Sequence, residues 1–115
     1  MTLLELARNA LDDGKAQNLV ELDVRGMTTV TDHMLICSGT SSRHVKALAD
    51  NLVKTCKDAG HQPHGVEGLD DAEWVLVDLG GVVAHVMQQQ ARAFYQLEKL
   101  WSVEPSAEGS SAGAE

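Results

Sequence analysis

The segment from Trp74 to Met87 constrains the fold most strongly, because it predicts two neighbouring strands and their pairing together. Trp74–Leu79 and Val82–Met87 are short runs rich in apolar, strand-forming residues. Gly80 and Gly81 stand between the two runs, and adjacent glycines supply the positive φ angles of a two-residue hairpin turn. We therefore expect an antiparallel hairpin at this point of the chain.

Side chains alternate between the two faces of a strand, and this alternation suggests a contact surface on the first strand of the hairpin. Val75 and Val77 would face the core, whereas Trp74, Leu76 and Asp78 would share the opposite face. An indole beside a carboxylate on a partly exposed face suits a basic protein partner, since interfaces are enriched in aromatic residues. The alternative interpretation is that Trp74 only covers the edge of the sheet.

Three further strands are predicted from shorter runs. Apolar and acidic residues alternate from Asn18 to Val24, which is typical of a strand with one face in water. Met34–Cys37 is an unbroken apolar run and favours a strand buried on both faces. Gly65–Glu67, shortly after Pro63, is the last candidate.

The N-terminal segment predicts a helix. Thr2 and Glu5 form a capping box ahead of apolar residues at helical spacing. Gly14 is expected to end this helix in a left-handed conformation.

The longest helix is predicted between Ser41 and Gly60. Val45–Cys56 carries apolar residues at helical spacing, and Ser41 or Ser42 is the expected N-cap. Gly60 is expected to stop this helix.

The C-terminal part predicts a third helix and then a tail. Phe94, Leu97 and Trp101 fall on one helical face and are expected to form its core stripe. Residues 102–115 are Ser, Ala, Gly and Glu with little else, so we expect a disordered tail after a single domain at residues 1–101.

The order of these elements predicts a single α/β domain with a mixed, five-stranded sheet packed with helices. The strand–helix–strand unit from Met34 to Glu67 should make a right-handed parallel crossover, while the hairpin is antiparallel.

Charge placement favours a protein partner over nucleic acid. The net charge is −8, and no Lys or Arg occurs between Asp58 and Ala91, where six acidic residues lie. Such a surface repels phosphate backbones, so we expect no direct nucleic-acid binding here and a basic protein as the better partner. The alternative is an acidic surface that serves solubility alone.

The sequence predicts a cytoplasmic protein. It contains no apolar run long enough to span a membrane and no secretory signal pattern. Cys37 and Cys56 both lie within apolar patterns and form no disulfide framework, which fits a reducing compartment.

Two segments resemble sites of chemistry, and each has a structural interpretation. Ser38–Arg43 is a Gly/Ser loop between strand and helix that suits phosphate, but helix capping explains it as well. Cys56, His61 and His64 are metal-ligand types, yet Cys56 continues a buried stripe and no fourth ligand has suitable spacing. We therefore expect no cofactor and no metal.

His85 is a lone histidine within a strand, which is usually a partly buried residue hydrogen-bonded to a neighbour. Asp78, across the hairpin, is the candidate neighbour. An Asp–His contact also serves acid–base catalysis, but no nucleophile lies beside it in a recognisable motif, so we expect no enzyme.

Several blocks together resemble the Iojap-like family of bacterial ribosomal silencing factors. No single block is specific, but their order and spacing from Leu3 to Trp101 are. The blocks that carry the resemblance are Asp23-Val24-Arg25-Gly26, Asp32, Ser38-Gly39, Arg43, Val45, Glu67-Gly68, Trp74-Val75-Leu76-Val77-Asp78-Leu79-Gly80, His85-Val86, Arg92, Phe94-Tyr95, Leu97-Glu98 and Leu100-Trp101.

The resemblance implies a nucleotidyltransferase-like α/β fold and homodimers in the free form. It further implies binding to the large ribosomal subunit through ribosomal protein fourteen, which blocks joining of the small subunit and represses translation under nutrient limitation. We assign this contact to six residues: Trp74, Leu76, Asp78, His85, Arg92 and Tyr95. Tyr95 suits either the partner surface or a dimer contact.

The sequence departs from the family pattern at a few positions, which puts the detailed contact surface in question. His33-Met34 stands where an aromatic pair is usual, Gly81 where an acidic residue is common, and Met87 where an aromatic is frequent. Two rival hypotheses are a large-subunit biogenesis factor, which would share the docking surface, and a nucleotidyltransferase that uses the Ser38 loop.

Overall fold

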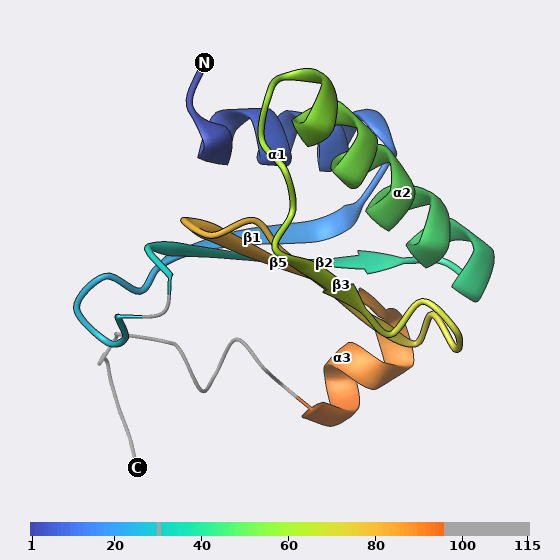
Figure 1. Cartoon of the computed structure of the whole chain (residues 1–115). Helices are drawn as coiled ribbons and strands as arrows, with labels where there is room; N and C mark the ends of the chain where they lie inside the picture. Colours follow the sequence, from blue (N-terminus) through green and yellow to red (C-terminus); the bar gives the residue numbers. More distant parts are fainter. Residues whose placement is uncertain (30, 96–115) are drawn as a thin grey trace, which may run out of the picture.

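Eight helices and strands follow one another in the predicted order in the computed structural model, which describes residues 1–29 and 31–95 (Figure 1). The elements are α1 (Leu3–Asp13), β1 (Gln17–Asp23), β2 (His33–Gly39), α2 (Ser42–Asp58), β3 (Gly65–Glu67), β4 (Trp74–Asp78), β5 (Val82–Gln88) and α3 (Gln89–Tyr95).

The strands form one mixed five-stranded sheet, as the sequence predicts, and their order in it is β1-β2-β5-β4-β3. β2 and β5 are parallel neighbours at the centre, and the other neighbouring pairs are antiparallel. The crossover from β2 through α2 to β3 is parallel in direction, as expected. However, β5 and β4 lie between these two strands, so the crossover spans most of the sheet.

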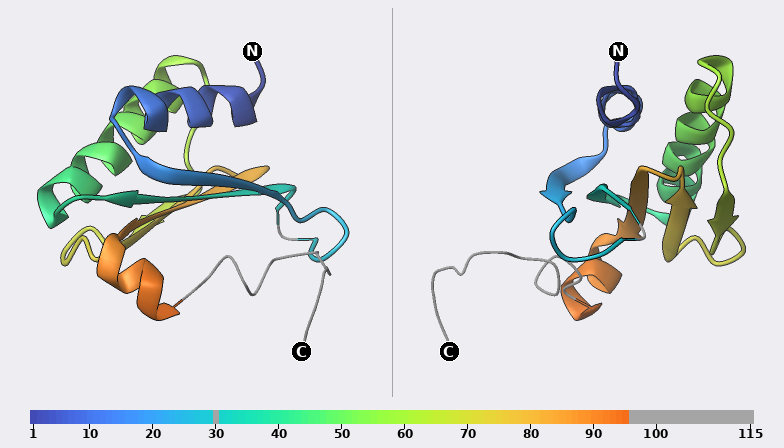
Figure 2. Two further views of the ribbon diagram at one scale, coloured as in Figure 1. Left: turned by 180° about the vertical axis from the view of Figure 1, so that it is seen from behind. Right: turned by 60° about the vertical axis from the view of Figure 1, so that its left-hand side comes forward.

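Helices cover the two faces of the sheet unequally. α1 and α2 lie together on one face, and the short α3 lies on the other (Figures 1 and 2). The main core fills the space between α1, α2 and the sheet, and includes the fully buried Leu11, Leu35, Leu48 and Leu52. A smaller cluster near α3 includes Ile36, Met87 and Ala91. The side of the sheet that carries α3 is therefore the one with room for exposed residues on β4.

The hairpin has the predicted register. Trp74 pairs with Met87 and Asp78 with Val83, and the Leu79 N–H donates to the Val82 carbonyl at 2.8 Å. The prediction of two positive φ angles is wrong in part, because only Gly80 adopts one, at +90°. One positive φ at the first turn residue is the requirement of a type II′ hairpin, which also matches the twist of the strands.

The helix ends follow their predicted caps except at Gly14. The Thr2 capping box forms, Ser41 caps α2, and Gly60 follows α2 with a φ of +92°. Gly14 is not left-handed: its φ is −83°, and Lys15 takes the positive value of 68° instead. Gly14 is needed for space, because a Cβ there would lie 2.6 Å from Leu48 Cδ2.

The third helix corrects one core prediction. Phe94 is 80% exposed, so the expected core stripe is wrong at this position. α3 instead buries Ala91 and Arg92 against the sheet, which turns Phe94 outward. Leu97, Trp101 and the predicted tail at 102–115 lie outside the described residues. Within the described part of the chain, no helix combines the length and apolar character needed to cross a bilayer.

Candidate partner-binding face

Three side chains of β4 form a half-exposed row on the side of the sheet that carries α3. Val75 and Val77 are fully buried in the main core, while Trp74, Leu76 and Asp78 are each of intermediate exposure. The predicted alternation of faces is confirmed. Tyr95 of α3 lies beside the row, with its ring centroid 4.8 Å from that of Trp74. We call Trp74, Leu76, Asp78 and Tyr95 the β4 face.

The turn before β4 fixes the position of Trp74. Gly68 has a φ of +92°, and a Cβ at this position would lie 2.2 Å from the Trp74 carbonyl oxygen. On the side of β5, the backbone N–H of Gln88 donates to the Glu73 carbonyl at 2.9 Å, and the Gln88 side-chain amide donates to the Ala72 carbonyl at 3.1 Å. The backbone that carries Trp74 is therefore bound on both sides.

His85 lies beside this row on the same face of the sheet, and it is hydrogen-bonded to Trp74, not to Asp78. The Trp74 indole Nε1–H donates to His85 Nδ1 at 2.9 Å. Leu76 stands directly opposite His85, so Trp74 and Asp78 are its diagonal neighbours. The long indole reaches back across this diagonal, whereas Asp78 Oδ1 accepts the Gly80 N–H at 2.9 Å within the turn. The expected neighbour was therefore wrong. The expected hydrogen bond to a neighbouring side chain is confirmed, and His85 is buried more completely than the partial burial expected.

His85 is neutral at physiological pH. Its side chain is 5% exposed, and this burial lowers the pKa of His85 to about 4. Because the indole N–H is only a donor, Nδ1 must accept and the ring proton lies on Nε2. Since His85 is buried, its assigned role in partner binding would be exerted mainly through Trp74.

The exposed end of the β4 face continues into a pair of aromatic rings on α3. Tyr95 is 48% exposed, and Phe94 packs edge-on against it with ring centroids 5.0 Å apart. Sequence reasoning had placed Phe94 in the core and therefore missed it as a surface residue. No local pattern marks Phe94 as a surface residue, because the packing of Ala91 and Arg92 decides which side of α3 meets the sheet.

Arg92 is separate from the β4 face. Its guanidinium is nearly buried, and Nη1 donates to the Asn18 carbonyl at 2.6 Å and to Ser38 Oγ at 3.1 Å. These contacts tie α3 to β1 and β2. Among the six residues assigned from the sequence, Arg92 is thus the one that the structure places away from the others.

Acidic residues surround the entry to β4. Asp70, Asp71 and Glu73 are exposed in the turn that leads to Trp74, and Glu67 is exposed on β3. These exposed acids give the Trp74 end of β4 a negative surface, and the half-exposed Asp78 adds negative charge at the other end of the strand. A negative surface around an aromatic patch matches a partner rich in Lys or Arg.

The enzyme-like loop and the metal-like residues have structural roles. Ser41 Oγ accepts the His44 N–H at 3.1 Å as N-cap of α2, and Ser38 Oγ accepts from Arg92. Cys56 is fully buried in the main core. The His64 ring lies against Gly80, with its Cε1 3.0 Å from where a Cβ would be. Ser38, Ser41, Cys56 and His64 therefore each have a hydrogen-bonding, capping or packing contact that accounts for their position.

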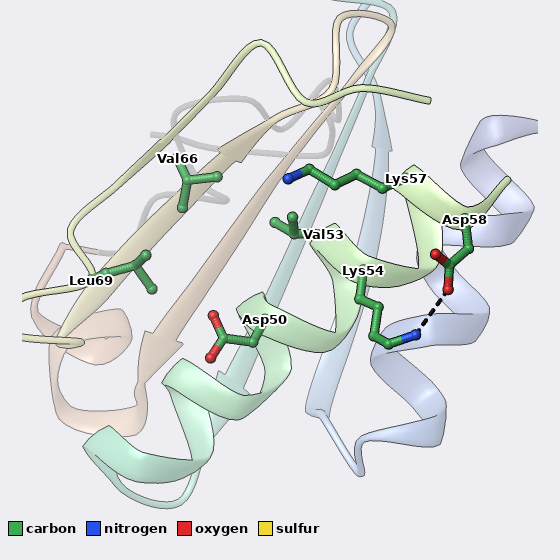
Figure 3. Close-up of a pocket in the computed structure, with 7 residues that line it drawn as sticks. All are labelled: Asp50, Val53, Lys54, Lys57, Asp58, Val66 and Leu69. Atoms are coloured by element: carbon green, nitrogen blue, oxygen red, sulfur yellow. Dashed lines mark hydrogen bonds and ion pairs between the residues drawn. The ribbon is translucent and has the colours of Figure 1, made fainter. Parts of the chain in front are cut away.

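A shallow hollow of about 290 Å³ lies between α2 and the segment that includes β3 (Figure 3). Val53, Val66 and Leu69 supply its apolar surface. Lys54 turns away toward Asp58, and their charged atoms are 2.9 Å apart. This hollow is on the α2 side of the sheet, whereas the β4 face is on the α3 side.

The fold and the β4 face define the chain as a small α/β domain with a mixed five-stranded sheet and one partly open sheet face. Comparison with known proteins gives the family. The chain belongs to the ribosomal silencing factors, because the family model described as "Ribosomal silencing factor during starvation" matches residues 1–114. The family predicted from the sequence is thereby confirmed.

Individual relatives agree with this assignment. The ribosomal silencing factor RsfS of Haemophilus influenzae is 51% identical and aligns over 89% of this chain and all of its own length. RsfS of Bacillus subtilis is 42% identical over 93% of this chain and 91% of its own. A mouse protein named "Mitochondrial assembly of ribosomal large subunit protein 1" is 34% identical over 87% of this chain, and this chain matches 45% of it.

Solved structures confirm the architecture. A crystal structure of a Chromobacterium violaceum protein superposes with a TM-score of 0.85 at 42% identity and covers 86% of this chain and 82% of that one. A Bacillus halodurans crystal structure has a TM-score of 0.80 at 46% identity, with 86% and 92% coverage.

Proposed function

We propose that the protein binds the large ribosomal subunit through ribosomal protein fourteen, blocks joining of the small subunit and represses translation when nutrients are limiting. The observation that carries this proposal is the β4 face, a half-exposed aromatic and acidic row in a chain of the silencing-factor family. The mechanism is steric occlusion and requires no chemistry. We accordingly propose a cytoplasmic regulatory protein that is not an enzyme and that is a homodimer when free.

The chemistry of the β4 face supports a basic protein partner. Trp74 and Tyr95 offer large, partly exposed rings of the kind that dominate interface energetics. Asp78 and the exposed acids of the preceding turn add complementary charge. Because charge attraction contributes, raising the salt concentration should weaken binding and slow association.

Co-sedimentation tests the proposal. The purified protein is centrifuged with separated large subunits, separated small subunits and joined ribosomes, and we expect it to pellet with free large subunits alone. Tyr95→Ala, which removes an exposed ring, should weaken this binding about tenfold. Lys54→Ala on the α2 side is the matched control and should bind like the wild type. Failure to bind any particle at low salt would refute the proposed function.

A second candidate is a factor that guards a maturing large subunit. The name of the mouse relative, which refers to assembly of the large ribosomal subunit, favours this alternative. Such a factor would use the same face. The two functions are separated by affinity: an assembly factor binds precursor particles more tightly than mature large subunits, and a silencing factor does not.

A further inference from the structure

The hydrogen bond between Trp74 and His85 determines what Trp74 can offer a partner. An indole has one polar hydrogen, and in this structure it is given to His85 Nδ1 at 2.9 Å. The donor is therefore already used before any partner arrives. What Trp74 leaves for a partner is its ring.

The ring is held in one orientation from two directions. The hydrogen bond fixes its polar edge to β5, and the centroid of the His85 ring is 5.8 Å away at a tilt of 49°. Tyr95 packs on it with centroids 4.8 Å apart and a tilt of 46°. His85 is itself immobilised, because it is 5% exposed within the central strand β5.

We propose that His85 is a positioning residue for the β4 face: it holds the Trp74 indole through its Nε1–H, so that Trp74 meets the partner with its ring. This inference rests on the proposed function. The matching chemistry on the partner is a Lys or Arg side chain, because a cation over an indole ring gains a cation–π interaction. Tyr95 provides a second ring beside the indole, and Asp78, four residues further along the same face of β4, adds negative charge to the surface that meets the partner.

Pre-ordering Trp74 contributes to affinity without adding a contact. A free indole on a strand would lose rotational freedom on binding, and immobilising a side chain costs free energy at that step. Here the protein has already ordered the ring. Removing the hydrogen-bond acceptor should therefore weaken binding even though the buried His85 has little surface to offer a partner.

A double-mutant cycle tests this role. Affinity for large subunits is measured for the wild type, His85→Leu, Trp74→Phe and the double variant. In the wild-type background His85→Leu should weaken binding about fivefold, the size of one hydrogen bond. Phe has no N–H, so in the Trp74→Phe background the same change should alter affinity by less than about twofold. An equal loss in both backgrounds would overturn the proposal, since His85 would then act independently of the indole.

Further variants separate positioning from loss of folding. His85→Gln keeps a side-chain acceptor and should bind within about twofold of the wild type. Asn51→Ala removes a hydrogen bond to the Ala10 carbonyl on the α1–α2 side, and is the control for destabilisation alone. Hydrogen exchange of the Trp74 indole, read by NMR and identified by its absence in Trp74→Phe, should accelerate in His85→Leu. Unchanged exchange would also overturn the proposal. If the wild type binds large subunits but the effects of the His85 and Trp74 substitutions are additive, only the positioning role is refuted. If the wild type does not bind at all, the proposed function is refuted as well.

Discussion

Mild acid should destabilise the protein through His85. Burial lowers the pKa of this imidazole to about 4 in the folded protein, against 6.5 for a solvated histidine. The unfolded chain therefore binds a proton at higher pH than the folded one. The contribution of His85 to the free energy of unfolding is fully present above pH 6.5. It is lost as the pH falls toward 4, because protonation of His85 then favours the unfolded state.

The size of this effect follows from the two pKa values. One pKa unit corresponds to about 1.4 kcal/mol, so the full loss from His85 at low pH is about 3 kcal/mol. Between pH 7 and pH 5 the loss is about 2 kcal/mol. For a domain of this size, such a loss should lower the urea midpoint by about 1 to 2 M. The protonated ring would also lose Nδ1 as an acceptor for Trp74, since both nitrogens then carry hydrogen.

Urea unfolding at pH 7, 6 and 5, followed by circular dichroism, measures this loss. His85→Gln is the matched control, because it keeps an acceptor for Trp74 but does not titrate. The variant retains the other four histidines, so their contributions cancel in the comparison. We expect the wild type to lose about 2 kcal/mol more than the variant between pH 7 and pH 5. Equal losses, or an NMR titration of His85 centred near pH 6.5, would show that burial does not suppress its protonation.

Three substitutions test other features of the fold. Gly14→Ala should lower the free energy of unfolding by about 1 to 2 kcal/mol, because its Cβ would press on the buried Leu48, whereas Gly26→Ala, with open space around it, should be neutral in the same urea titration. Arg92→Met should cost about 2 kcal/mol because it loses the hydrogen bonds to Asn18 and Ser38, and unchanged thermal unfolding would contradict this role. Phe94→Ala should change the free energy of unfolding by less than about 0.5 kcal/mol, because Phe94 is 80% exposed. A large fall in melting temperature would show that the Phe94 ring is packed in the core.

The sequence predicted those parts of the fold that depend on local patterns. The two-residue turn fixed the hairpin register, and strand alternation placed Trp74, Leu76 and Asp78 on one face, because both follow from neighbouring residues. The capping box at Thr2 is equally local. These predictions required no knowledge of what packs against the segment.

The errors arose where tertiary packing decides. Trp74 and Asp78 are both diagonal neighbours of His85, so the strand register alone does not say which of them forms the hydrogen bond. The longer Trp74 side chain reaches His85 and forms it. Gly14 was assigned a left-handed φ, but its requirement is space for Leu48 of another helix. Phe94 was assigned to the core because its spacing to residues further along suggested a stripe, whereas α3 meets the sheet through Arg92. The order of strands in the sheet was likewise not encoded in any local pattern.

The parallel pairing of β2 with β5 has a consequence for synthesis of the chain. His33 pairs with Val82 and Gly39 with Gln88, so the centre of the sheet joins segments from distant parts of the sequence. Bringing these distant segments together costs more loop-closure entropy than forming the β4–β5 hairpin, so the β2–β5 pairing is expected to form more slowly. Until β5 has emerged during translation, one edge of the buried strand β2 has no partner. An unpaired apolar edge is a template for aggregation, so chains that terminate before β5 should associate rather than fold.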